Sequence, residues 1–335
     1  MAVKIKLLAK FSSAHDHGYR PVPGWPGYEY SRSTSARDYD WLVVYDEMPQ
    51  KSSGSVIRGK EPLECSPDHT ILVTQEPGSV KSYGRAFVHQ FGHYLTTREY
   101  ELEEHPNYHL GRGYYWSYYG KKMQEAGSID PLLKVKMISA VCSAKQMRHT
   151  CHSRRFQLIS HLAGAVQGFD WFGRGVKPLG RKYEALDSYK YHVAVENHIQ
   201  KGHCTEKLLD SILGECLTFY AGDPDVGTWL PPESFVPIPL DDFSEAERIV
   251  KSAIADNLFE KRIEAIKEAK RLILTKYNFW SQVIAVIESA SKECLAHAPR
   301  NRSKFIVSRR NFRMNPIVAV RDAACYLSRV FKNMA

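Results

Sequence analysis

Residues 189–243 read YKYHVAVENHIQKGHCTEKLLDSILGECLTFYAGDPDVGTWLPPESFVPIPLDDF and place polar groups at two points of an apolar strand-helix-strand pattern. The run 192–195 predicts a buried strand that leads directly into Glu196 and Asn197. Apolar residues would be expected there if the strand only filled a core. Because open α/β sheets bind ligands at the carboxyl ends of their strands, we expect this carboxylate and this amide to belong to a ligand site.

A helix is expected to begin shortly afterwards, at Thr205. Threonine is a preferred N-cap, and the run 207–217 repeats apolar residues at helical spacing. The free N–H groups of a first helical turn attract anions, and Lys207 adds a full positive charge, so this turn is a candidate diphosphate site. Thr-Glu-Lys at a helix start also fits an ordinary first turn, and that alternative stays open.

The remaining motifs follow in a fixed order, and together they resemble the donor-binding half of glycosyltransferase family 10, the α1,3/4-fucosyltransferases. In that family the segments FEN, TEK, G-x-P, LP-x-SF and DDF take up GDP-fucose. The matching segments here are VEN at 195–197, TEK at 205–207, Gly222 with Pro224, LPPESF at 230–235 and DDF at 241–243. The resemblance covers about residues 139–243.

This resemblance implies an inverting transferase that moves L-fucose from GDP-fucose to a hydroxyl of a glycan or glycolipid acceptor. Glu206 resembles the family's carboxylate beside the fucose ring and is a predicted catalytic residue. In the segment Ser153-Arg-Arg-Phe156, either Arg154 or Arg155 matches the diphosphate-binding arginine, and Arg154 is the first choice. The full set of predicted donor-binding residues is Arg154, Glu196, Asn197, Lys207, Gly173 and Gly222.

Inverting transfer also needs a base for the acceptor hydroxyl and cations for the departing diphosphate. Glu76 is the candidate base, since it follows the predicted strand 70–74 at a ligand-facing strand end; a solvated turn residue is the alternative. A guanidinium and an ammonium group can compensate a diphosphate, so neither a cofactor nor an obligatory metal is expected.

The sequence departs from the family pattern next to the donor motif. His198 follows VEN, where the family usually has a small hydroxyl residue, and His203-Cys204 precedes TEK, where it often has Tyr-Val. A transferase of the same fold that uses another GDP-linked deoxysugar therefore stays open as an alternative.

Length and pattern predict two domains. A chain of 335 residues exceeds the size of one ordinary core, and alternating strands and helices indicate parallel sheets. We expect an α/β protein of GT-B type, with two Rossmann-like domains facing a cleft: residues 1–130 for the acceptor, 131–300 for the nucleotide-sugar, and a tail at 301–335. Residues 12–40 are expected to form a long loop, and 245–254 and 260–291 to be helical. The aromatic stretch 113–119 is expected either to line the acceptor cleft or to pack between the domains.

The net charge of +9 is concentrated at the C-terminus. Residues 300–335 hold nine Lys and Arg against one Asp, a net charge of +8, and 315–331 are amphipathic. Such a tail fits peripheral contact with an anionic membrane, or a helix that packs on the N-terminal domain. A non-catalytic module that binds polyanions through this tail is the alternative from another class, although no nucleic-acid partner is expected.

Other classes lack their necessary motifs. The sequence contains no GxxxxGK[ST] and no GxSxG. Seven scattered cysteines argue against a disulfide framework, and Cys142, His149, Cys151 and His152 lack metal-site spacing. No apolar run approaches the length that crosses a bilayer, and the N-terminus resembles a strand more than a signal peptide, so we expect a cytoplasmic protein.

Overall fold

The computed structural model describes residues 2–10, 25–49, 53–77, 80–99, 105–118, 134–145, 151–292, 304–320 and 323–324. The chain forms two compact units. The first is built mainly on Arg20–Gly111 and takes up the chain again at Gln282, and the second is built on Arg112–Ser281. The limits 1–130, 131–300 and 301–335 stay predictions.

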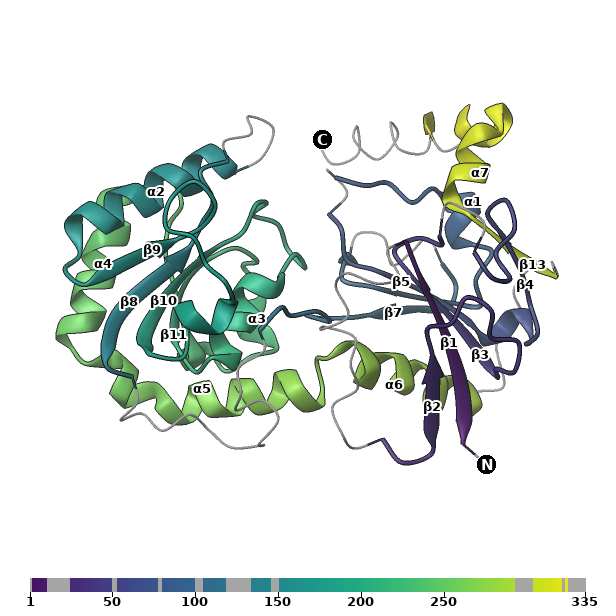
Figure 1. Cartoon of the computed structure of the whole chain (residues 1–335), viewed down its shortest axis with the longest axis horizontal. Coiled ribbons are helices and arrows are strands. Elements are labelled where there is room, and N and C mark those ends of the chain that lie inside the picture. Colours follow the sequence, from purple (N-terminus) through teal and green to yellow (C-terminus); the bar gives the residue numbers. More distant parts are fainter. Residues whose placement is uncertain are drawn as a thin grey trace. The chain divides into compact units, whose positions relative to one another are not determined.

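The first unit contains a six-stranded sheet in the order β2-β1-β3-β5-β6-β7 (Figure 1). Every neighbouring pair of its strands is parallel. These strands are β1 (Val3–Ala9), β2 (Tyr28–Ser31), β3 (Trp41–Tyr45), β5 (Thr70–Thr74), β6 (His93–Thr96) and β7 (Tyr108–Leu110). The continuous apolar runs in β3 and β5 are buried almost throughout, as is typical of parallel strands covered on both faces.

Two features of this unit differ from expectation. The predicted loop 12–40 contains β2, whose partly exposed residues gave no apolar run to detect, while residues 11–24 lie outside the described part. Near the C-terminus, β13 (Phe305–Val307) pairs antiparallel with β4 (Lys60–Pro62), and Ile306 is buried. The start of the basic tail therefore packs on the first unit.

The second unit contains a five-stranded parallel sheet in the order β12-β11-β10-β8-β9. Its strands are β8 (Lys136–Val141), β9 (Phe169–Phe172), β10 (Tyr189–Val195), β11 (Leu217–Ala221) and β12 (Phe235–Pro237). Tyr191, Val193 and Val195 alternate along β10 into one core cluster with apolar residues of α2 (His152–Ala165) and α4 (Phe243–Ala255). His192 is buried too and contacts Ser139 of β8.

The predicted helix 260–291 is two helices, α5 (Leu258–Thr275) and α6 (Phe279–Lys292). Asn278 interrupts it, because its side-chain oxygen accepts the Ser281 N–H at 2.8 Å and thus caps α6. Backbone hydrogen bonds also join Tyr114 to Tyr277 and Phe279. The aromatic residues Tyr114, Trp116 and Tyr118 belong to the second unit and are buried.

Two parallel sheets in one chain confirm the α/β fold class. That the two units face a common cleft stays a prediction. Across the described residues, we find no helix that is both long and apolar enough to cross a membrane.

Candidate functional site

Glu196 lies at the carboxyl end of β10 and is fully buried. Its carboxylate accepts hydrogen bonds from the backbone N–H and the hydroxyl of Thr205, at 2.9 and 2.6 Å. Lys207 Nζ lies 3.2 Å from Oε2, and the Tyr220 hydroxyl lies 3.5 Å from Oε1. Both carboxylate oxygens thus have hydrogen-bond partners within the protein. The predicted donor-binding residue Glu196 therefore holds the start of α3 (Glu206–Leu213) against the end of β10.

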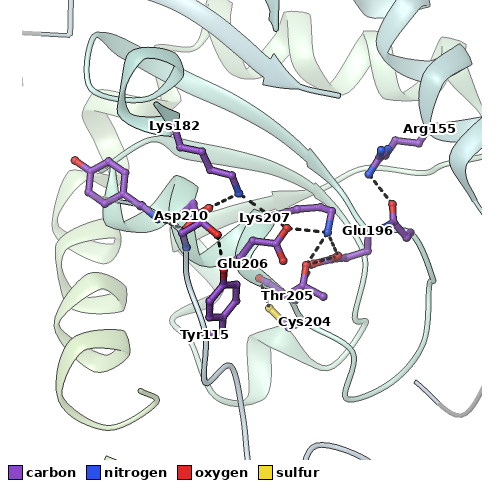
Figure 2. Close-up of polar contacts among 12 residues, drawn as sticks. Tyr115, Arg155, Lys182, Glu196, Cys204, Thr205, Glu206, Lys207 and Asp210 are labelled. Atoms are coloured by element: carbon purple, nitrogen blue, oxygen red, sulfur yellow. Dashed lines mark hydrogen bonds and ion pairs between the residues drawn. The ribbon is translucent and has the colours of Figure 1, made fainter. Parts of the chain in front are cut away.

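Lys207 is the centre of this network (Figure 2). Its ammonium group contacts Glu196, the Thr205 hydroxyl at 2.8 Å and Glu206 Oε1 at 3.3 Å. Burial opposes the charge, but the carboxylates of Glu196 and Glu206 prevail and raise the pKa of Lys207. Its positive charge is therefore fixed at the first turn of α3, where free N–H groups also favour an anion.

Glu206 lies between two ammonium groups (Figure 2). Besides Lys207, it contacts Lys182 Nζ at 3.9 Å. Burial favours the neutral acid, yet Lys207 and Lys182 together lower the pKa of Glu206 to about 2. The carboxylate consequently stays ionised at neutral pH.

Asn197 follows Glu196 and is held by the start of α2. Its side-chain oxygen accepts a hydrogen bond from Arg155 Nη1 at 2.6 Å, and its backbone carbonyl accepts the Cys151 N–H at 2.9 Å. Arg155 is buried, and its Nε has no hydrogen-bond partner among the described residues. Arg155 also lies near enough to Lys207 to influence the pKa of that lysine.

Arg154 lies elsewhere on the same helix. Its side chain is 56% exposed and pairs with Asp241 at 3.4 Å. Consecutive residues of a helix point about 100° apart, so only one of these two arginines can face Asn197. The structure brings Arg155 to the site and leaves Arg154 at the surface.

The two predicted glycines allow close backbone approach. A Cβ at Gly222 would lie 2.2 Å from the Tyr220 hydroxyl and 2.7 Å from Glu196 Cγ, so a side chain there would displace the Glu196 network. Gly173 has a φ of +145°, and a Cβ there would lie 2.3 Å from the Cys142 carbonyl oxygen. Gly222 thus borders the site, whereas Gly173 shapes the turn after β9 beside the end of β8.

Glu76 belongs to the first unit, where it is exposed just beyond the carboxyl end of β5. Its backbone carbonyl accepts a hydrogen bond from the buried guanidinium of Arg98, which also donates to the Lys81 carbonyl at 2.8 Å. Glu76 therefore stands at a strand end of a parallel sheet, as expected, and its role as a base stays a prediction.

Three residues of the network were missed by the sequence analysis or ranked second: Lys182, Asp210 and Arg155. Asp210 lies one turn after Glu206 on α3 and is buried. In the sequence, the one sign of this was a charged residue inside the apolar run KLLDSILGECL. Lys182 pairs with it from 28 residues away, which no local pattern reveals. Among the described residues no group of three or more His, Cys, Asp or Glu side chains is arranged to hold a metal ion.

The fold is that of an α/β protein. In its second unit, a lysine and an arginine lie beside buried acidic groups at the carboxyl end of a parallel sheet. Residues 132–291 match the model of glycosyltransferase family 10 (fucosyltransferase) C-term. This match covers just under half of the chain, and it confirms the predicted resemblance to the family and the predicted glycosyltransferase class.

Solved structures agree with this fold. A crystal structure of an α1,3-fucosyltransferase has a TM-score of 0.53 and 16% identity, and the match covers 90% of this chain and 93% of that one. A crystal structure of an α1,3-fucosyltransferase with GDP-fucose has a TM-score of 0.51 and 15% identity, and this match also covers 90% of this chain and 93% of that one. The GT-B fold is confirmed by these matches. None of the curated proteins compared with this chain matches it.

Proposed function

We propose that this protein transfers L-fucose from GDP-fucose to a hydroxyl of a glycan or glycolipid acceptor with inversion at the sugar carbon. The observation that carries the proposal is the ionised Glu206 beside the fixed ammonium of Lys207 at the start of α3. Both residues lie within the segment that matches the fucosyltransferase family. One similar structure was solved with GDP-fucose, which supports this donor.

The donor roles follow from charge. Lys207, Arg155 and the first N–H groups of α3 compensate the departing diphosphate, and this electrostatic stabilisation lowers the barrier most where the site is dry. The anionic Glu206 stabilises the positive charge that develops on the sugar ring. Protein cations alone supply the compensation in this scheme, so we expect activity to persist in EDTA.

Glu76 is the proposed base. A carboxylate takes the proton from the acceptor hydroxyl as the new bond forms, and the diphosphate leaves from the opposite face of the sugar. Its place after β5 supports the assignment, because parallel sheets present their ligand-binding residues at this end.

The test is turnover with defined donors. The purified protein is incubated with a panel of oligosaccharides and GDP-fucose, a second GDP-deoxysugar, or a UDP- or CDP-sugar, and nucleotide release is measured. We expect release of GDP from GDP-fucose and a product whose anomeric configuration, determined by NMR, is opposite to that of the donor. Faster turnover of the second GDP-deoxysugar would reassign the donor, and turnover of only UDP- or CDP-sugars would refute the proposal.

Contact with a membrane is proposed for the part of the tail that follows β13. Met314, Ile317 and Val320 are 72%, 73% and 69% exposed, and the basic residues Arg310 and Arg313 precede them. Apolar residues beside cations favour an anionic lipid surface. Flotation with phosphatidylserine vesicles but not with phosphatidylcholine vesicles is expected, and Ile317→Glu with Val320→Glu should abolish it.

The alternative of a polyanion-binding module draws on the same basic tail. Arg309, however, donates from Nε to the Ser82 carbonyl at 2.7 Å and lies 3.9 Å from Glu47, so this cation is already engaged within the first unit. Engagement of this kind leaves fewer cations of the tail available to a polyanion. We therefore place the catalytic proposal first.

A further inference from the structure

Lys182 connects two acidic residues of α3. It begins the short 3-10 helix η6 (Lys182–Ala185), and its ammonium group pairs with Asp210 and lies 3.9 Å from Glu206. Figure 2 shows Lys182 directed at both carboxylates from outside the helix. The side chains of Lys182 and Glu206 are 26% and 27% exposed, whereas that of Asp210 is 3% exposed.

Asp210 is a fixed anchor for this lysine. Its Oδ1 accepts the backbone N–H groups of Ser117 at 2.6 Å and Tyr118 at 2.7 Å, and its Oδ2 pairs with Lys182. A carboxylate held by two backbone amides cannot follow a moving partner, so it sets the position of the ammonium group. Lys182 is therefore held by a rigid acceptor.

Glu206 and Asp210 stand four residues apart on α3. Like charges at this spacing repel, and the side chains lie on one face of the helix. The ammonium of Lys182 relieves the repulsion, because it contacts both carboxylates. Glu206 then has a cation on each side: Lys207 from its own helix and Lys182 from η6.

We propose that Lys182 is a positioning residue for Glu206, which it holds against Lys207 in the orientation that faces the donor sugar. The inference rests on the proposed function, because it assigns Lys182 an effect that acts only through Glu206. Without Lys182, Glu206 keeps a cation on one side only and gains rotamers that point away from the sugar. Misplacement of a reacting or stabilising group by about 1 Å can cost up to about 10²-fold in rate.

The test replaces the ion pair as a unit. Removing Lys182 alone would leave the buried Asp210 carboxylate without its ion-pair partner, which is strongly destabilising, so the variant is Lys182→Gln with Asp210→Asn. The two amides can hydrogen-bond to each other, and the amide oxygen introduced at position 210 can still accept the Ser117 and Tyr118 N–H groups. The matched control is Lys190→Gln with Glu260→Gln, a more exposed ion pair of the same unit.

The expected result is a fall in kcat of about tenfold or more with GDP affinity, measured by calorimetry, unchanged within about twofold. The control pair should retain wild-type values, and both proteins should melt cooperatively. Lys182→Arg, which keeps the charge and the Asp210 contact, should retain most of the wild-type kcat.

A double-mutant cycle separates the inference from the proposed function. In a Glu206→Gln background the Lys182/Asp210 replacement should cause no further loss of kcat, since residues that act through one group are not additive. If Glu206→Gln lowers kcat and the Lys182/Asp210 replacement lowers it again by the same factor, the inference is overturned and the proposed function stands. A loss of GDP affinity as large as the loss of kcat would also overturn it, because Lys182 would then bind the diphosphate directly. If Glu206→Gln alone retains full activity, the role of Glu206 in the proposed function is refuted, and the inference about Lys182 is refuted with it.

Discussion

Glu196 and Thr205 are joined by two hydrogen bonds, one from the Thr205 backbone N–H at 2.9 Å and one from its hydroxyl at 2.6 Å. They tie the buried end of a central strand to the N-cap of α3. The carboxylate thereby fixes the turn that presents Glu206 and Lys207, and it does so from a fully buried position. The two residues therefore hold the predicted donor site in place.

Removing the Glu196 carboxylate should lower the stability of the protein as well as its activity. Glu196→Ala leaves the Thr205 N–H and the partly buried Lys207 without their main acceptor, so the free energy of unfolding should fall by about 3–5 kcal/mol. Urea unfolding monitored by circular dichroism measures it. Glu245→Ala, which removes an exposed pair with Arg248, is the control and should change the free energy by less than about 0.5 kcal/mol. Equal stabilities of the two variants would show that Glu196 does not hold the start of α3 in place.

The two neighbouring arginines should differ sharply. Arg155→Ala should weaken GDP binding about tenfold or more, because the site loses a buried guanidinium that orients Asn197 and whose Nε has no described partner. Arg154→Ala removes an exposed pair with Asp241 and should change GDP affinity by less than about twofold. Calorimetry measures the GDP affinity of both variants. A larger loss of affinity in Arg154→Ala than in Arg155→Ala would assign the diphosphate-binding role to Arg154.

Glu76→Gln should separate catalysis from donor binding. The amide keeps the shape of the side chain but cannot accept the proton, so turnover should fall about 10²-fold or more while GDP affinity stays unchanged. Glu64→Gln, an exposed carboxylate of the same unit paired with Arg37, should retain turnover. Full turnover of Glu76→Gln would remove this residue from the mechanism.

Acid should destabilise the first unit through buried histidines. Burial, aided by the nearby His109, His105 and His69, lowers the pKa of His93 to about 4. Between about pH 6.5 and 4 the unfolded chain binds a proton at this ring and the native protein does not, so stability falls as the pH falls through this window. Urea midpoints measured across it should show that slope.

His93→Asn should make the dependence on pH shallower, whatever its effect on absolute stability. An unchanged slope in His93→Asn would show that another group is responsible.

The strands and the donor turn could be predicted because their signals are local. Apolar runs in β5 and β10 and the helical spacing after Thr205 are properties of about five to eleven consecutive residues. Strand β2 is short, polar and partly exposed, so it lacks such a run. The interruption at Asn278 depends on a capping bond and on the distant Tyr114, which a continuous amphipathic pattern conceals.

The site itself was predictable in outline and less so in its contacts. A family motif located Glu196, Asn197, Glu206 and Lys207, and the structure brings all four together in the second unit. The motif did not show whether Arg154 or Arg155 faces Asn197, because that depends on the rotation of α2 relative to β10. Lys182 and Asp210 meet only through the fold.

The central claim is that the turn formed by Glu196, Thr205, Glu206 and Lys207 binds the diphosphate of a guanosine nucleotide. Calorimetric titration of GDP into the wild type, Lys207→Ala and the surface control Lys251→Ala measures this most directly. We predict one GDP bound per chain, affinity at least about tenfold lower in Lys207→Ala, and no change in Lys251→Ala. No binding of GDP to the wild type, or equal affinity in Lys207→Ala, would contradict the claim.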